Sequence, residues 1–232
     1  QTALNLAVAL HKTRKLERAS DAYQQAVRLR PDAKQAWVNL GVLFQEGGQW
    51  KEARQAYEKA LQISPDLPEV QYNLACVLEQ TDSVDDSERL FAKLLTKSPD
   101  LEDAWFRLGH LRLKRHDYRN ATEAFQNCVR KRPDWREAQM NLALCLWNSG
   151  NQDAAAKAYE HVLASDPNNL DALRALAAVT IDQKDFEKAL DYQARLIEAG
   201  ERTPELFYNT GLLLQKSGQL ERRSYKQVRI VA

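Results

Sequence analysis

The sequence predicts an all-α protein, a solenoid built from repeated pairs of antiparallel helices. The first observation behind this prediction is a fixed period, because short turns such as "SPD" and "RPD" recur every 34 residues. The second is that apolar residues within each period recur at three- and four-residue spacing, in two blocks separated by a polar or glycine-containing turn. A period of this length indicates repeated helical hairpins. The prolines that mark it are Pro31, Pro65, Pro99, Pro133 and Pro167.

Counting Lys34 as position 1 of a repeat divides the chain into seven repeats. The first begins one residue before Gln1, and the others begin at residues 34, 68, 102, 136, 170 and 204. We expect residues 1–220 to form the repeat array, as six units of 34 residues and the first helix of a seventh. Residues 221–232 break the pattern, because Arg223 and Gln227 stand where a small residue and an aromatic residue recur. We expect an irregular capping helix there, or a non-native or disordered tail.

Three repeat positions predict the core of each hairpin. Position 8 stays small even where glycine costs a helix about 0.5 to 1 kcal/mol, so we expect the two helices to approach closely there. Position 20 is small for the same reason, and position 24 is aromatic in five repeats, to fill the space between helices. Position 8 holds Ala7, Gly41, Ala75, Gly109, Ala143, Ala177 and Gly211. Position 20 holds Ala19, Ala53, Ser87, Ala121, Ala155 and Ala189, and position 24 holds Tyr23, Tyr57, Phe91, Phe125 and Tyr159.

The pattern W-x2-L-G occurs at Trp37–Gly41 and Trp105–Gly109, followed in each repeat by A-x3-Y/F and a closing proline. Together with the period, it resembles the tetratricopeptide repeat (TPR) family over residues 1–220. The resemblance implies a right-handed superhelix whose first helices line a concave groove that binds peptides or protein segments. Departures from the pattern predict local irregularity in the third and sixth repeats. They are Gln71 and the turn "TDSVDD" in the third, and Thr180, Gln193 and Glu201 in the sixth.

The charge balance, the apolar runs and the cysteines of the chain predict the class of its partner and its cellular compartment. The chain has 33 basic and 32 acidic residues, a net charge of +1, which argues against a nucleic-acid partner. No apolar run approaches the roughly 18 residues of a membrane helix, so we expect no direct membrane insertion. Cys76, Cys128 and Cys145 fall within helical segments, which favours buried thiols in a reducing compartment. We therefore expect a cytoplasmic location, although a signal or anchor upstream of this sequence stays open.

Residues for catalysis or metal binding do not stand out from the repeat. The glycines and prolines occupy repeat positions and turns, which leaves none for a phosphate loop or a nucleophile elbow. The histidines show no metal-binding spacing. We therefore predict no catalytic residues, no metal site, no cofactor and no enzyme activity for this chain. The histidines are His11, His110, His116 and His161.

Position 6 is asparagine in most repeats and lies on a helical stripe formed by positions 2, 5, 6, 9, 12 and 13. An asparagine amide both donates and accepts hydrogen bonds, so a series of them can bind successive peptide groups of an extended chain. The series resembles the asparagine ladder in the repeat arm of protein O-linked N-acetylglucosamine transferases. The alternative is that the asparagines bond within neighbouring helices. The series comprises Asn5, Asn39, Asn73, Asn141 and Asn209, with Arg107 and Ala175 interrupting it.

Aromatic residues at positions 5 and 12 of the same stripe are the candidate anchors for a bound segment. Tyr72, Phe106 and Trp147 are the strongest of them, because exposed aromatic side chains are costly unless a partner covers them. Packing between repeats is the alternative. Arg107 lies in a locally basic repeat that could bind an acidic segment or simply be solvated. Acidic residues at position 2 are explained by the helix dipole in preference to a basic ligand.

These observations predict a protein–protein interaction scaffold that binds a peptide or protein segment in its groove. One alternative is the substrate-recognition arm of a larger enzyme, such as a protein glycosyltransferase. Another is a self-assembling scaffold, because the end of an uncapped solenoid exposes apolar surface.

Overall fold

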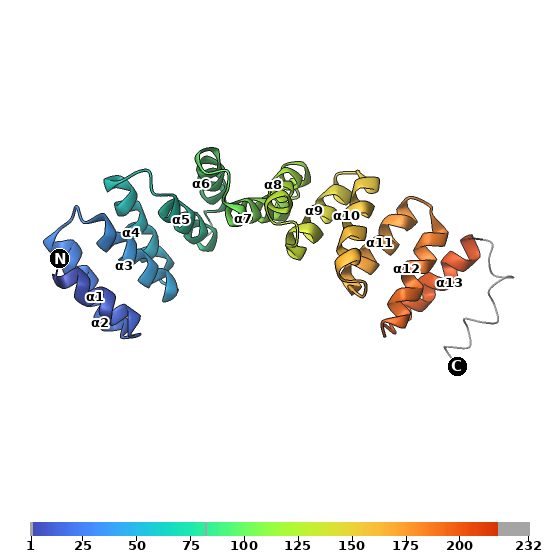
Figure 1. The fold of residues 1–232 in the computed structure, drawn as a ribbon, viewed down its shortest axis with the longest axis horizontal. Helices are drawn as coiled ribbons and strands as arrows, with labels where there is room; N and C mark the ends of the chain where they lie inside the picture. The colour runs from blue at the N-terminus through green and yellow to red at the C-terminus, as the bar shows by residue number, and fades with distance from the viewer. Residues whose placement is uncertain (1, 82, 218–232) are drawn as a thin grey trace. The chain divides into compact units, whose positions relative to one another are not determined.

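The computed structural model describes residues 2–81 and 83–217, which form thirteen α-helices and no strand (Figure 1). The helices are α1 (Thr2–Lys12), α2 (Leu16–Leu29), α3 (Lys34–Glu46), α4 (Trp50–Ile63), α5 (Pro68–Gln80), α6 (Val84–Lys97), α7 (Glu102–Lys114), α8 (Tyr118–Lys131), α9 (Arg136–Asn148), α10 (Gln152–Ser165), α11 (Leu170–Asp182), α12 (Phe186–Glu198) and α13 (Pro204–Lys216). The two helices of a repeat pack together as antiparallel hairpins, α1 with α2, α3 with α4, α5 with α6, α9 with α10 and α11 with α12. The predicted all-α fold of helix pairs is therefore confirmed.

The helix boundaries follow the sequence repeat. Every first helix from α3 to α13 begins at repeat position 1 and is 13 residues long. Every second helix begins at position 17. Proline opens α5 and α13, where its missing N–H has no intrahelical partner to lose. The 34-residue period therefore sets where each helix starts.

The chain divides into two compact units, with the division between Leu111 and Arg112, inside α7. The first unit contains α1 to α6 and most of α7, and the second contains α8 to α13. Each unit is described by itself below. The prediction made for residues 221–232 concerns a segment that lies outside the described residues.

In the first unit, the small residues at position 8 lie where the two helices of a hairpin cross. A Cβ atom added to Gly41 in α3 would lie 2.5 Å from Cε1 of Tyr57 in α4. The Tyr57 ring is fully buried, so it cannot move aside into solvent. In the next hairpin the hydroxyl of Ser87, at position 20, donates to the Ala75 carbonyl at 2.7 Å. Both contacts confirm the predicted close crossing.

In the second unit, the core has the residues that the repeat pattern predicts, but the last described helix, α13, differs from the other first helices at position 8. Ala143, Tyr159 and Leu173 are buried in one apolar cluster, as the repeat pattern predicts. Gly211 in α13 is exposed, and no atom of the described residues lies within 4 Å of a Cβ added there. The close approach predicted at position 8 is therefore present at Gly41, whereas residues 2–81 and 83–217 contribute none at Gly211.

The third repeat keeps the regular hairpin geometry despite its glutamine. Gln71 donates from Nε2 to the Pro65 carbonyl at 2.8 Å. Trp37, at the same repeat position, donates from its indole to the Pro31 carbonyl at 2.8 Å. The two side chains anchor the start of the first helix to the preceding proline turn in the same way. The irregularity predicted from Gln71 is not seen in α5, because an amide replaces the indole as donor.

The sixth repeat satisfies each of its unusual polar residues internally. The Thr180 hydroxyl donates to the Leu176 carbonyl at 2.7 Å. Gln193, only 4% exposed, accepts a hydrogen bond from the Thr210 hydroxyl at 2.8 Å. Glu201, which replaces the closing proline, accepts from Arg174. Helices α11 and α12 keep 13 residues each, so hydrogen bonding compensates for the departures.

Candidate functional site

Polar contacts identify the face that successive first helices share in the first unit. Arg107 of α7, at position 6, approaches Glu79 of α5, at position 12, with 3.6 Å between Nη1 and Oε2. His11 of α1, at position 12, lies 3.1 Å from Glu46 of α3, at position 13. These are positions of the predicted stripe, and we call the surface that they form the first-helix face.

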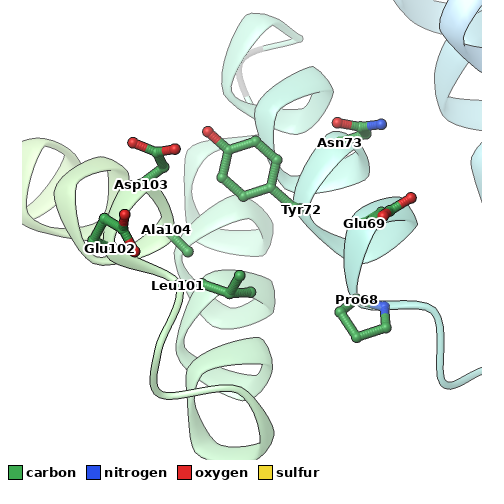
Figure 2. Close-up of a pocket in the computed structure, with 8 residues that line it drawn as sticks. All are labelled: Pro68, Glu69, Tyr72, Asn73, Leu101, Glu102, Asp103 and Ala104. Carbon is green, nitrogen blue, oxygen red and sulfur yellow. The ribbon is translucent and has the colours of Figure 1, made fainter.

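A pocket of about 540 Å³ opens on this face between α5 and α7 (Figure 2). Its lining combines apolar side chains with one phenol, one amide and three carboxylates. Figure 2 shows Tyr72 extending from α5 toward α7, with Asp103 opposite. We call it the α5–α7 pocket; it is lined by Pro68, Glu69, Tyr72, Asn73, Leu101, Glu102, Asp103 and Ala104.

Tyr72 is held in place from two sides. Its ring packs edge-on against buried Phe91, with 5.7 Å between the ring centroids. Burial is the main cause that raises the pKa of the Tyr72 hydroxyl, and the nearby charge of Asp103 acts in the same direction. A hydrogen bond with Arg107 acts in the opposite direction. Tyr72 therefore presents a neutral phenol in a fixed orientation, as an aromatic wall of the pocket.

Arg107 interrupts the asparagine series as a cation that the protein itself holds. Burial opposes its charge, but Cys76, Tyr72 and Glu79 together raise its pKa. The Glu79 side chain is only 11% exposed, whereas that of Arg107 is 47% exposed. Arg107 therefore balances a nearly buried carboxylate and orients Tyr72, while part of the guanidinium reaches the surface.

A second pocket of about 320 Å³ lies between α1 and α3 on the same face. It includes Asn39, together with His11 and Glu46. Asn39 accepts a hydrogen bond from Gln35, one helical turn earlier, at 2.9 Å. Asn39 and Asn73 thus each line a pocket on the first-helix face. Asn5 is exposed on α1.

The asparagines of α3 and α5 also act on buried tyrosines of the preceding second helix, through the pKa of each hydroxyl. Burial raises the pKa of Tyr23, and a hydrogen bond with Asn39 lowers it. Burial likewise raises the pKa of Tyr57, with a lowering contribution from Asn73. The Tyr57 hydroxyl also donates to Gln45 at 2.8 Å. These two contributions fit the alternative use of the asparagines, bonding between neighbouring helices, which stays a prediction.

The remaining predicted residues do not converge on one pocket. Phe106 is half-buried on α7, with its ring centroid 6.2 Å from that of His110. In the second unit, Asn141 is half-buried on α9, and the Trp147 indole donates to Asp182 of α11 at 2.9 Å. Asn209 is exposed on α13. Of the predicted set, the structure brings Tyr72 and Asn73 together, with Arg107 in contact with Tyr72.

Sequence reasoning missed the contribution of Glu69 and Asp103 to a pocket, because each was explained by the dipole of its own helix. Both stand at position 2, and Tyr72 stands between them in the sequence. Acidic residues at position 2 of two successive repeats, with an aromatic residue at position 5 of the first, are the signal that could have found the pocket. It also missed Glu79, whose partner lies 28 residues away and has no marked spacing in the repeat.

Within residues 2–81 and 83–217, none of the helices combines the length and apolar character needed to cross a membrane. No group of three or more histidine, cysteine, aspartate or glutamate residues in that part could hold a metal ion. Cys128 and Cys145 are buried, and burial raises the pKa of the Cys145 thiol to about 12.

Three family models match the chain, and all describe tetratricopeptide repeats. Two general TPR models match residues 4–68 and 43–109. A third, described as the TPR domain of cytochrome c-type biogenesis protein H, matches residues 90–199. Together the three cover residues 4–199 without a gap.

Two curated relatives match shorter stretches. A UDP-N-acetylglucosamine–peptide N-acetylglucosaminyltransferase from Caenorhabditis elegans is 35% identical over 75 residues, which is 32% of this chain. Tetratricopeptide repeat protein 8 from the same organism is 32% identical over 72 residues, or 31% of this chain. These stretches are 6% and 14% of the lengths of the two relatives.

Solved structures of the same fold cover more of the chain. YrrB, described as a TPR protein with an unusual peptide-binding site, has a TM-score of 0.70 and 21% identity, and the match covers 86% of this chain and 99% of YrrB. MamA has a TM-score of 0.67 and 17% identity, covering 72% of this chain and 91% of MamA. A tetratricopeptide repeat protein from Parabacteroides merdae has a TM-score of 0.66 and 17% identity, and the match covers 95% of this chain and 88% of that protein. By its family models, its helix pairs and its repeat signature, the chain belongs to the tetratricopeptide repeat family.

Proposed function

We propose that the chain binds an extended protein segment along the first-helix face, with asparagine side chains holding the backbone of the segment. Tetratricopeptide repeats and the matching structures support the broader role of a protein-interaction scaffold, and proteins of this fold are generally non-catalytic. The observation that carries the proposal is the placement of Asn39 and Asn73, each in the lining of a pocket on the first-helix face.

Hydrogen-bonding capacity supports a second use of these asparagines. A side-chain amide has two N–H donors and an oxygen that accepts two hydrogen bonds. Tyr57 takes up part of this capacity at Asn73, and Tyr23 and Gln35 take up part at Asn39. Each amide can still bond a peptide N–H or C=O of a partner while its internal bond fixes the orientation. An oriented amide loses less conformational entropy on binding than a free one.

Aromatic side chains supply the complementary apolar contacts. Tyr72 lies beside Asn73 in the α5–α7 pocket, and Phe106, also at position 5, belongs to the next first helix. In the second unit, Trp147, Asn141 and Asn209 extend the proposed set, with the Trp147 indole oriented by Asp182. We propose these residues and Arg107 as the contact surface, with the aromatic residues acting as anchors.

A pair of matched variants tests the proposal. Peptides that bind the whole chain are first selected from a random library. Their affinities for an Asn39→Ala/Asn73→Ala variant and for a Tyr23→Phe/Tyr57→Phe variant are then measured by fluorescence anisotropy. The second variant removes the two tyrosine hydroxyls on which Asn39 and Asn73 act, together with the bonds of those hydroxyls to His11 and Gln45, but keeps both amides. We expect the asparagine variant to weaken binding about tenfold or more, and the tyrosine variant to retain it. Equal losses in the two variants would mean that the asparagines act only by supporting the fold.

The short match to an N-acetylglucosaminyltransferase favours a second candidate, the substrate-recognition arm of a larger enzyme. The sequence of the gene beyond this chain tests it, because an arm of this kind is encoded together with a transferase domain. Self-association and a cytoplasmic location stay predictions. Light scattering across a concentration series tests the first, and imaging of a tagged full-length protein tests the second.

A further inference from the structure

From the charge and shape of the α5–α7 pocket, we propose that it is a specificity subsite for an arginine side chain of the bound segment. The inference rests on the proposed function, because the arginine would belong to the protein segment that the chain is proposed to bind. The pocket itself supplies the selectivity. Its volume of about 540 Å³ exceeds that of a single side chain, and it leaves room for the backbone at its mouth.

The lining suits both parts of an arginine side chain. Pro68, Leu101 and Ala104 offer apolar surface for the methylene stem. Glu69 from α5 and Asp103 from α7 offer carboxylates on opposite sides of the opening, as Figure 2 shows. A guanidinium can bond to carboxylates in two directions at once because its five N–H donors lie in one plane.

Charge balance around the pocket favours a cation. Glu69, Glu102 and Asp103 bring three formal negative charges to the lining. None of the eight residues that line the pocket is cationic, and Arg107, which acts on Tyr72, also approaches the nearly buried carboxylate of Glu79. Side chains with this formal charge attract a basic side chain and repel an acidic one.

The sixth repeat contains an internal version of the same arrangement. Arg174 stands at position 5, which Tyr72 occupies in the third repeat. Its guanidinium lies 2.7 Å from Asp171 at position 2, the counterpart of Glu69, and 2.9 Å from Glu201 at the closing turn. The repeat geometry thus places an arginine within reach of the position-2 carboxylate. In the third repeat the chain has a tyrosine there, and the partner would supply the arginine.

Tyr72 adds a reason to expect arginine in preference to lysine. Its ring is a pocket wall held by Phe91 and Arg107, and a planar guanidinium stacks on an aromatic ring better than an ammonium does. The helix-dipole explanation of Glu69 and Asp103 remains compatible with this role, because a carboxylate in the first turn can serve both purposes.

A small probe tests the subsite without a peptide. Nα-acetyl-arginine N-methylamide and its uncharged citrulline counterpart are titrated into the ¹⁵N-labelled full chain, and backbone amide shifts of Tyr72, Asn73 and Asp103 are followed. We expect the arginine probe to bind about fivefold more tightly than the citrulline probe, because two exposed charge pairs are gained. Equal affinity for the two probes would overturn the proposal.

Matched variants separate the subsite from the helix dipoles. A Glu69→Gln/Asp103→Asn variant should lose the preference for arginine. The control, Glu137→Gln/Glu205→Gln, removes position-2 carboxylates from α9 and α13 and should leave the preference unchanged. A preference that survives the first variant, or that disappears equally in both, would also overturn the proposal.

Library-derived peptides then distinguish this proposal from the proposed function. Peptides that bind the chain equally well with arginine or citrulline at each position would reject the subsite and leave backbone binding intact. If no extended peptide binds while the arginine probe still shifts the pocket signals, backbone binding is rejected and the subsite stands.

Discussion

The two compact units place different neighbours at the same repeat position. Gly41 in the first unit and Gly211 in the second both stand at position 8 of a first helix. A side chain at Gly41 would collide with the Tyr57 ring, whereas no atom of residues 2–81 and 83–217 lies within 4 Å of one at Gly211. Repeat position therefore fixes the direction in which a residue points, but the neighbouring element decides what the residue must do.

The same contrast holds for the asparagine series. Asn73 in the first unit acts on the buried Tyr57 hydroxyl, where it opposes the rise in pKa that burial causes. Asn141 in the second unit follows Phe125 at the corresponding position, and a phenylalanine has no hydroxyl to offer. Position 5 differs as well, with Tyr72 in the third repeat and Arg174 in the sixth. An asparagine in this series can therefore be structural, functional or both, and the two units allow the roles to be separated.

The largest expected contrast concerns position 8. Gly41→Ala should destabilise the protein by about 1 to 3 kcal/mol, because its Cβ overpacks against a fully buried ring. Gly211→Ala should stabilise it by up to about 1 kcal/mol through helix propensity. Urea unfolding followed by circular dichroism measures both. The same sign for the two substitutions would remove the contrast between the units.

A double-mutant cycle sharpens this result. Combining Gly41→Ala with Tyr57→Leu should cost less than the sum of the single variants, because the leucine side chain vacates part of the space of the ring. Additive costs would show that Gly41 is required for a reason other than the contact with Tyr57.

The next effect concerns the buried glutamine that replaces an aromatic residue in the second unit. Thr210→Val removes the hydroxyl that donates to Gln193 at 2.8 Å, which leaves a buried amide oxygen without that donor. We expect a loss of about 1 to 3 kcal/mol in the free energy of unfolding. In a Gln193→Met background the same Thr210→Val change should cost much less, and a full cost in that background would contradict the pairing.

A smaller effect compares the two asparagines. Asn73→Ala should cost about 1 kcal/mol of stability, because Tyr57 loses one of its hydrogen-bond partners. Asn141→Ala should cost less than about half of that, since Phe125 makes no such bond. Urea midpoints of the two variants, compared with wild type, test the difference. A larger cost at Asn141 would reverse the assignment.

The smallest effect concerns the internal arginine. Arg174→Gln should cost at most about 1 kcal/mol, because Arg174 is about half exposed and salt screens its pairs with Asp171 and Glu201. The difference between variant and wild type should shrink at high salt. A salt-independent cost would indicate that the side chain acts through packing.

The helix boundaries and most of the core could be predicted from the sequence, because they repeat with the 34-residue period. The helix starts at positions 1 and 17 and the small residues at positions 8 and 20 recur in every complete repeat, and position 24 is aromatic in all of them but the sixth, so the period alone predicts them. Gln71 was expected to disturb its repeat, yet it makes the same bond to the proline turn as Trp37. A change of residue type conceals a conserved hydrogen-bond geometry, which only coordinates reveal.

The candidate site was less predictable, because its contacts join different repeats. Asparagine, aromatic and acidic side chains were each recognised by position. The pairings Tyr57 with Asn73 and Arg107 with Glu79 depend on the stagger between helices, which a period does not specify. The acidic pocket around Tyr72 was missed for the same reason.

Backbone binding by asparagine is tested most directly with an altered backbone. A peptide that binds the full chain is compared with analogues in which one amide N–H at a time is replaced by an ester oxygen, which leaves every side chain unchanged. We predict that ester replacement at particular positions lowers affinity about tenfold, and that the loss disappears in the Asn39→Ala/Asn73→Ala variant. Equal losses in wild type and variant, or no loss at any position, would contradict the account.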